Sequence, residues 1–219
     1  MTIRASAARA QAAGLPLRMM PSPTGISIGA DIGFAKRLPP GATESQGTTT
    51  FGASLALGLG PLTASAGISR LTTFDAAGKS SHDASVGAQA GVKVFGGPLV
   101  PLSVAIEGGL ARVTKRIDPA SPPPAGTDER RWRSHLGLGA SLTIPNPVLA
   151  VKPWLAPRLQ YDGGGGISLK RLRGAISAGV DLGLLNGITI RAMYDSRMLT
   201  EDPGDAPRVV SIGLGYSFR

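Results

Sequence analysis

Large apolar and small polar residues alternate along most of this chain with a period of two. The pattern is clearest in residues 208–218, where even positions from Val210 to Phe218 are large and apolar and odd positions from Ser211 to Ser217 are Ser or Gly. Such alternation is typical of a β-strand with one apolar and one polar face. It constrains the fold strongly, because a sheet of these strands directs all of its apolar faces to one side.

The same alternation from Gly25 onward predicts an all-β fold of about ten strands. Pro153 and Pro157 make the seventh and eighth strands the least regular, since a central strand resists proline. An eight-stranded barrel is the alternative, and it would require two hairpins to merge. We expect strands over residues 26–34, 49–59, 62–69, 84–94, 102–110, 135–144, 152–161, 176–184, 188–195 and 208–218.

The connections between these strands alternate between tight and long. With an even number of strands, the first strand begins and the last strand ends on the tight-turn side. This is the layout of an up-and-down antiparallel transmembrane barrel. Asn186-Gly187 is the strongest hairpin signal. Tight turns are expected near residues 60, 97, 146 and 186, and long polar connections at 38–48, 75–83, 118–131, 162–170 and 198–207.

Composition excludes several other classes of protein. The chain has no cysteine, so it holds no disulfide and no thiolate metal site. No apolar run approaches the roughly 18 residues that a transmembrane helix needs. The net charge of +9 suggests nucleic-acid binding, but the sequence contains no basic helix and no basic face interleaved with aromatic residues. We expect no nucleic-acid partner, no cofactor and no metal.

The phase of the charges indicates which face of the sheet meets lipid. The mid-strand charges lie on the small polar face together with nearly every strand glycine. A soluble barrel would carry many Lys and Glu and few Gly on its outer face, whereas a narrow lumen suits Gly and Ser. The apolar face is therefore expected to point outward. Aromatic residues at its two ends predict girdles formed by Phe34, Phe51, Phe74, Trp132, Tyr161, Tyr216 and Phe218.

This architecture resembles the small outer-membrane β-barrel proteins of Gram-negative bacteria over residues 25–219. The strand that closes on Tyr216 and Phe218 is similar to their terminal strand, although Arg219 follows. The resemblance implies a bacterial outer-membrane location and insertion by the barrel-assembly machinery. It does not select an activity, because such barrels include structural anchors, adhesins, porin-like channels and hydrolases.

Residues 1–24 stand outside the repeat. They lack the apolar centre of about 7 to 15 residues that a secretory signal has. Two interpretations stay open: a leader remnant, in which Ala10-Gln11-Ala12 resembles a cleavage site, or a disordered N-terminal tail.

The lumen charges support two functional hypotheses. Opposite charges in a narrow interior favour pairing, which predicts a structural or surface-binding barrel whose lumen is largely closed by salt bridges. The alternative is a narrow passive channel with mild anion preference, lined by Lys93, Arg158 and Arg191. The expected network comprises Asp31, Lys93, Glu107, Arg133, Arg158, Asp181, Arg191 and Asp195.

Outward-phase cations gather at the long-loop ends of the strands. A ring of cations above an apolar band suits the phosphates of lipopolysaccharide, although ordinary snorkelling at the interface makes similar contacts. The expected rim residues are Lys36, Arg70, Arg112, Lys170 and Arg208.

An enzymatic role is not expected. Resemblance to the omptin proteases would require Asp-x-Asp and Asp-x-His, and neither spacing occurs. His82 is expected in a solvated loop, and His135 as a polar residue of the lumen. A hydrolase at the rim, with His135 and Asp195 as its inward pair, is a distant third hypothesis.

Overall fold

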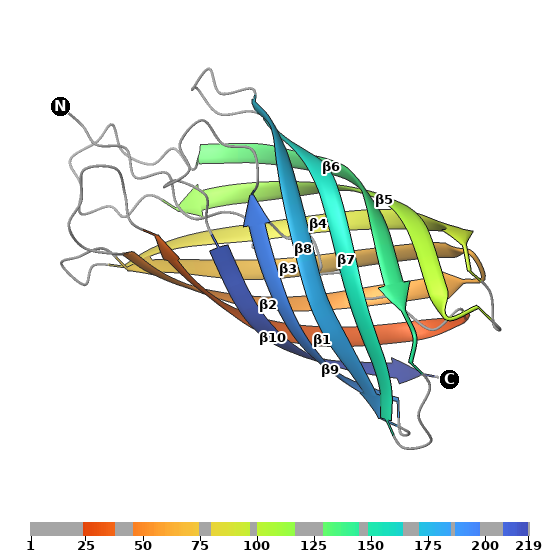
Figure 1. Ribbon diagram of the computed structural model, residues 1–219. Coiled ribbons are helices and arrows are strands. Elements are labelled where there is room, and N and C mark those ends of the chain that lie inside the picture. The colour runs from red at the N-terminus through yellow and green to blue at the C-terminus, as the bar shows by residue number, and fades with distance from the viewer. Residues whose placement is uncertain are drawn as a thin grey trace, which may run out of the picture.

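The computed structural model describes residues 24–37, 46–74, 80–96, 100–116, 129–144, 149–163, 171–184, 187–197 and 208–218. These form ten strands, each antiparallel to the next, and the first pairs with the last to close a barrel (Figure 1). The predicted ten-stranded up-and-down barrel is confirmed, and the eight-stranded alternative is wrong. The strands are β1 (Thr24–Arg37), β2 (Gln46–Leu59), β3 (Leu62–Phe74), β4 (Ser80–Phe95), β5 (Leu102–Arg116), β6 (Glu129–Leu142), β7 (Leu149–Gly163), β8 (Arg171–Leu184), β9 (Ile188–Arg197) and β10 (Arg208–Phe218).

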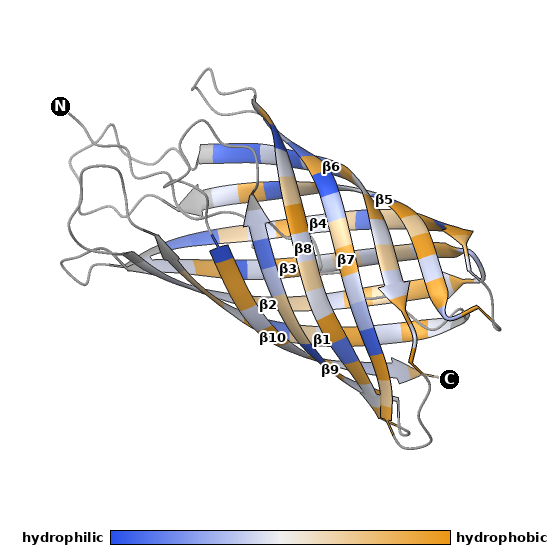
Figure 2. Cartoon of the chain, in the orientation of Figure 1, coloured by the Kyte–Doolittle hydropathy of each residue, from blue (hydrophilic) through white to orange (hydrophobic). Residues whose placement is uncertain are grey.

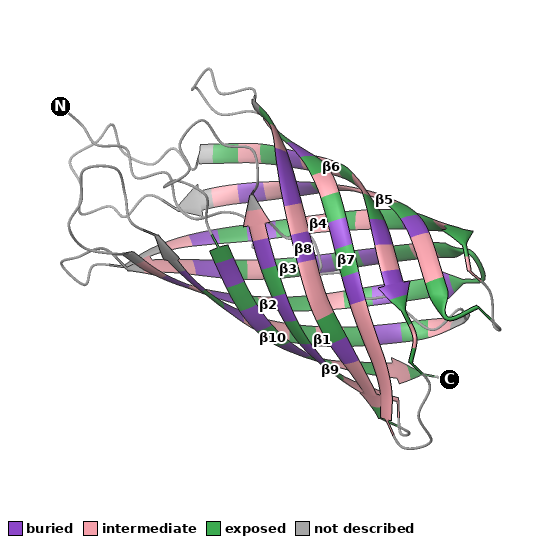
Figure 3. Cartoon of the chain, in the orientation of Figure 1, coloured by how far each residue is buried: buried purple, intermediate pink, exposed green. Residues whose placement is uncertain are grey.

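The barrel has its apolar face outside. On β10, Val210 and Leu214 are 57% and 59% exposed, whereas Ser211 between them is 1% exposed. Figures 2 and 3 show hydrophobic and exposed positions alternating with polar and buried ones along the strands. The buried apolar residues are mostly alanines, so the interior is no hydrophobic core. An exterior of exposed Leu, Ile and Phe is stable in lipid and not in water, and the barrel is therefore transmembrane.

No helix within the described ranges is long and apolar enough to cross a membrane.

The closing seam between β1 and β10 is in continuous register from Ile26 opposite Phe218 to Lys36 opposite Arg208. Gly25 permits this closure, because a Cβ there would lie 2.8 Å from the carbonyl oxygen of Phe218. The rings of Tyr216 and Phe218 meet edge to face at 4.9 Å. Residues 1–23 lie outside the described part, so the leader and the tail both remain predictions.

The strands run farther toward the long connections than the hydrophobic pattern predicts. β2 starts at Gln46, β4 starts at Ser80 and β6 starts at Glu129. Most of these added residues are polar, with Trp132 an exception, because the apolar alternation stops where lipid ends while backbone pairing continues. The prediction of His82 in a loop is therefore wrong: His82 belongs to β4, and its Nδ1 lies 3.2 Å from Thr72 Oγ1.

A bulge in β4 changes the phase of its last residues. The register with β5 shifts between Lys93 and Phe95, and Phe95 pairs with Val104. As a result Val94 and Phe95, consecutive in sequence, are both exposed on the outside, at 55% and 54%. A bulge places two residues opposite one and so reverses the alternation. Phe95 thereby joins Tyr216 and Phe218 among the exposed aromatic residues of the tight-turn end.

β7 tolerates its two prolines by giving up pairs on one side only. The β7–β8 ladder runs without a break through Pro153 and Pro157. The β6–β7 ladder lacks the pairs opposite both prolines and resumes as a single bridge between Ile144 and Val151. A proline has no N–H to donate to one of its neighbours, and here that neighbour is β6.

Candidate functional site

Charged side chains inside the barrel gather on the wall formed by β6 to β9. Three of them stand on β7, whose even-numbered residues face the lumen and include Lys152, Trp154, Arg158, Gln160 and Asp162. The opposite wall is lined chiefly by small polar residues, with a hydrogen bond of 2.6 Å between the hydroxyls of Ser69 and Ser85. The lumen holds charges on both walls, and the arginine–aspartate pairs described below lie on the β6–β9 wall.

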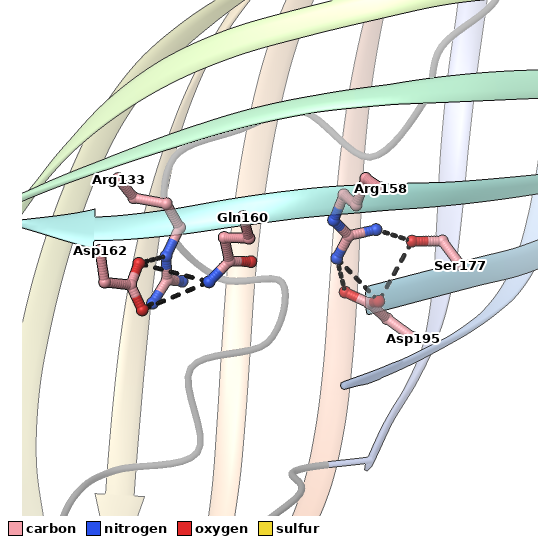
Figure 4. A network of polar contacts seen from close by, with 6 residues as sticks. All are labelled: Arg133, Arg158, Gln160, Asp162, Ser177 and Asp195. Atoms are coloured by element: carbon pink, nitrogen blue, oxygen red, sulfur yellow. Dashed lines mark hydrogen bonds and ion pairs between the residues drawn. The ribbon is translucent and has the colours of Figure 1, made fainter. Parts of the chain in front are cut away.

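The first cluster joins three strands through Asp195, which is 0% exposed. Arg158 of β7 places Nη2 2.8 and 2.7 Å from the carboxylate oxygens of Asp195 on β9. Ser177 of β8 lies between them, accepts a hydrogen bond from Arg158 Nη1 and donates one of 3.1 Å to Asp195 (Figure 4). A buried carboxylate is stable only when paired and hydrogen-bonded in this way.

The second cluster lies nearer the long connections. Arg133 of β6 binds Asp162 of β7 through Nε at 2.6 Å and Nη2 at 3.1 Å. Gln160, 2% exposed, donates through Nε2 to the same carboxylate at 3.3 and 3.4 Å (Figure 4). Arg173 Nη1 lies 4.0 Å from Asp162 Oδ2. One carboxylate is therefore approached by two guanidinium groups.

The third cluster lies toward the tight turns. Arg191 of β9 binds Asp181 of β8 in a bidentate pair, with Nε–Oδ1 at 2.6 Å and Nη2–Oδ2 at 2.7 Å. Trp154 Nε1 donates to Asp181 Oδ1 at 3.0 Å, and the Arg191 guanidinium carbon lies 5.9 Å from the Trp154 ring centroid. The site satisfies the indole N–H, which a buried Trp requires.

The other charges expected in the network lie on different strands. Asp31, Lys93 and Glu107 belong to β1, β4 and β5, and each is half-buried. For Asp31 and Lys93 no ion pair or hydrogen bond of the side chain is found in the described part of the chain. Among the expected charges, the ion pairs described above join Arg158 with Asp195 and Arg191 with Asp181.

His135 and Asp195 are not brought together. The imidazole of His135 lies over Gly109, where a Cβ would come within 2.6 Å of His135 Cε1. Its Nδ1 is buried and has no hydrogen-bond partner among the described residues. The described ranges also contain no contact between His135 and Asp195, which is bound by Arg158 and Ser177.

The sequence pattern does not predict Asp162 as a lumen residue, and it does not predict the hydrogen-bonding roles of Trp154 and Ser177. The predicted long connection at 162–170 includes Asp162, because four consecutive glycines follow it at positions 163–166. The usable signal was its phase: it continues the even-numbered lumen positions of β7. Trp154 and Ser177 share the lumen-facing phase of their strands. Their hydrogen bonds to Asp181 and Asp195 depend on the register between strands.

A cavity of about 100 Å³ lies in the tight-turn half of the lumen. Its walls come from β1, β2, β7, β8, β9 and β10. The side chains that bring charge or a hydroxyl to it include Ser27, Asp31, Lys152, Asp181, Thr189 and Arg191. Within the described ranges, no group of three or more acidic or histidine side chains is arranged to hold a metal ion.

The rim residues lie on the outward phase where they are described. Arg70 is paired across strands with Phe51, and Arg112 with Trp132. Arg70 and Arg208 are exposed, and Arg112 is half-buried. Lys170 and the side chain of Lys36 lie outside the described residues.

Aromatic side chains gather on the outer surface. Of the nine that the structure describes, eight are exposed and only Trp154 is buried. Tyr194 and Phe95 are exposed in addition to the expected set, and the side chain of Phe74 lies outside the described part. The exposed members of the expected girdles are Phe34, Phe51, Trp132, Tyr161, Tyr216 and Phe218.

Three solved structures are similar to this chain. The β domain of the Bordetella autotransporter BrkA is 13% identical, with a TM-score of 0.59 over 89% of this chain and 100% of that chain. Neisserial surface protein A is 15% identical, with a TM-score of 0.43 over 89% and 98% of the two chains. The transport unit of the autotransporter AIDA-I from Escherichia coli is 11% identical, with a TM-score of 0.44 over 89% and 90%.

No protein-family model and no curated protein sequence matches the chain. The likeness to the BrkA domain establishes the fold and not an activity. The predicted class, a small barrel of the bacterial outer-membrane type, is confirmed at the level of fold.

Proposed function

We propose that this chain is a structural or surface-binding barrel of the bacterial outer membrane, non-enzymatic, with a lumen largely closed by salt-bridged side chains. The observation that carries the proposal is the arginine–aspartate clusters on the β6–β9 wall. Arg158 and Asp195 are 15% and 0% exposed at their side chains, and Arg191 and Asp181 are each 10% exposed. Charges so desolvated and paired stiffen the wall and offer little to a passing ion.

The size of the lumen cavity supports the same proposal. Its volume of about 100 Å³ is confined to the tight-turn half, whereas a conducting pore needs a continuous water path through a hydrocarbon layer about 30 Å thick. The long side chains of Arg133, Gln160 and Arg158 extend from the inner face of the wall (Figure 4), and none of the three lines the cavity. We infer that they obstruct the path.

Planar-bilayer recording of the purified full chain tests this function. The proposal expects no steady single-channel steps from the unmodified protein. The fourfold variant R133A/D162A/R158A/D195A removes two ion pairs without changing the net charge of the lumen, and it serves as the conducting control. Steady steps from the unmodified protein would overturn the closed-lumen proposal.

The alternative is a narrow passive channel with mild anion preference. One observation favours it: Lys93 faces the lumen without an ion pair among the described residues. Arg158 and Arg191, the other expected cations, are each bound to an aspartate. If steps are seen, the reversal potential in a salt gradient should show anion preference that K93Q abolishes.

We further propose that the outer rim contacts the phosphates of lipopolysaccharide, and that the barrel-assembly machinery inserts the chain. Arg70 and Arg112 each stand opposite an exposed aromatic residue, Phe51 and Trp132. Arginine can bind a phosphate in a bidentate manner. Replacing Arg70, Arg112 and Arg208 with Gln should lower the lipopolysaccharide phosphate that copurifies, while K93Q in the lumen leaves it unchanged. Equal retention by the triple variant would contradict this contact.

A further inference from the structure

The lumen cavity exists because glycines line much of it. Gly29, Gly183, Gly213 and Gly215 project no side chain into the space between β1, β10, β9 and β8. Gly183 has ample room, since a Cβ there would meet nothing closer than Ala150 Cβ at 3.7 Å. The hollow is therefore a feature of the sequence that larger residues at these positions would remove.

Charges of alternating sign border this hollow along one row of the sheet. Following the cross-strand pairs from β1, the row reads Asp31, Gly213, Arg191, Asp181 and Lys152. Arg191 is occupied by its bidentate pair with Asp181. Beyond that pair the row holds Lys152 on one side and Asp31 on the other. Gly213 leaves a gap before Asp31, so Arg191 acts on the Asp31 carboxylate electrostatically and makes its hydrogen-bonded pair with Asp181.

The carboxylate of Asp31 is held at the cavity by close packing. Its oxygens lie 2.7 and 2.9 Å from the position that a Cβ of Gly52 would occupy. No hydrogen bond or ion pair of this carboxylate occurs in the described part of the chain. A half-buried carboxylate without a partner is costly, and a bound cation would remove that cost.

Ser27 gives a second, independent indication of a ligand. It is 2% exposed and lines the same cavity, yet its Oγ has no hydrogen-bond partner among the described residues. Buried hydroxyls are nearly always hydrogen-bonded. A cavity with a carboxylate that accepts no hydrogen bond from the described residues and a hydroxyl that lacks a partner is arranged for a solute that carries positive charge and hydrogen-bonding groups.

We infer that this cavity binds a small organic ammonium ion. An ammonium group offers three donors to acceptors such as Asp31 and Ser27, whereas Mg²⁺ and Ca²⁺ require six or more oxygens. The cavity volume of about 100 Å³ is well above the roughly 10–15 Å³ that a single water needs, so the cavity admits a small amine. The inference goes beyond the proposed function and does not depend on whether the lumen conducts.

Isothermal titration of the full chain in detergent micelles with ethanolamine hydrochloride tests the site. Ethylene glycol, similar in size but uncharged, and sodium chloride serve as comparison solutes. The expected result is saturable binding of ethanolamine that neither comparison solute displaces at equal concentration. Absence of saturable binding, or equal displacement by either solute, would overturn the assignment.

Variants locate the binding within the lumen. D31N should weaken ethanolamine binding about tenfold or more, and S27A by a smaller factor, because the hydrogen bond to the charged carboxylate is the stronger. E107Q removes a lumen carboxylate outside the cavity and should bind as the unmodified protein does. G183V keeps Asp31 but fills the cavity, so it should also lose ethanolamine binding. If D31N does not fold, G183V alone tests whether ethanolamine binds in the cavity. Unchanged affinity in folded D31N, or in G183V, would refute the site.

Discussion

Arg158 binds Asp195 across an intervening strand. The two residues belong to β7 and β9, yet Arg158 Nη2 lies 2.7 Å from Asp195 Oδ2, and Ser177 of β8 completes the contact. The pair therefore joins three neighbouring strands from the inside of the barrel, in addition to their backbone hydrogen bonds. Because Asp195 is fully buried, its carboxylate depends on this arrangement.

We expect D195N to destabilise the barrel by about 3 to 5 kcal/mol, because it leaves the Arg158 guanidinium buried without its counter-charge. R158M should cost a similar amount by leaving the carboxylate unpaired. Urea unfolding in phospholipid vesicles, followed by tryptophan fluorescence, measures both changes.

The double variant R158M/D195N provides the control for that prediction. Its cost should fall short of the sum of the single costs by about 0.5 to 3 kcal/mol, the range for residues in direct contact. Strictly additive costs would show that Arg158 and Asp195 do not interact in the membrane.

Two glycines on the lumen face of β8 should respond differently to alanine. A Cβ at Gly179 would lie 2.6 Å from both the Ala192 carbonyl oxygen and Trp154 Cζ2, whereas a Cβ at Gly183 would make only ordinary contacts. G179A should therefore destabilise by about 1 to 3 kcal/mol, and G183A should be nearly neutral. Urea midpoints in vesicles compare the two. Equal costs would mean that the Trp154 ring does not pack against β8.

The two tryptophans provide a test of the aromatic girdle. Trp132 is 50% exposed on the outer surface, and Trp154 is 6% exposed inside the barrel. Lipids brominated on their acyl chains should quench the fluorescence of W154F, which keeps Trp132, much more than that of W132F, which keeps Trp154. Similar quenching of both variants would contradict the assignment of Trp132 to the lipid interface.

Depth in the bilayer should set the cost of a charge on the outer face. Leu138 lies in the middle of β6, and Leu142 lies at its tight-turn end; both are exposed, at 52% and 40%. L138R should cost about 2 to 4 kcal/mol and L142R about 0 to 1 kcal/mol, because arginine reaches water near an interface. The free energy of unfolding in vesicles measures both. Equal costs would argue against a bilayer centred on Leu138.

The strand number and the strand order could be predicted because they depend on local alternation and on turn signals, and the outward apolar face because the phase of the charges is also local. Val210 and Leu214 share one face and Ser211 lies on the other, because successive side chains of a strand point to opposite faces. The mid-strand charges fell on the small-residue face, and that relation sufficed to choose lipid over water outside.

Features that depend on register were not predictable from alternation. Phe95 is exposed because of the β4 bulge between Lys93 and Phe95. The alternation of the sequence does not predict this bulge. Pairing of Arg133 with Asp162, and of Trp154 with Asp181, depends on which residues of two strands stand opposite each other. The predicted strands are too short on the side of the long connections, because His82 and Asp162 lie in ladders that continue beyond the apolar alternation.

Every functional proposal depends on lipid outside and charge inside, and spin labels at Leu55 and Ser54 test this most directly. These neighbours on β2 lie at nearly the same depth on opposite faces, with Leu55 53% exposed outside and Ser54 lining the lumen cavity. In lipid vesicles, oxygen should relax the label at Leu55 strongly, and a water-soluble nickel chelate should not. The label at Ser54 should show little access to oxygen. Strong oxygen access at Ser54 with shielding at Leu55 would contradict the account.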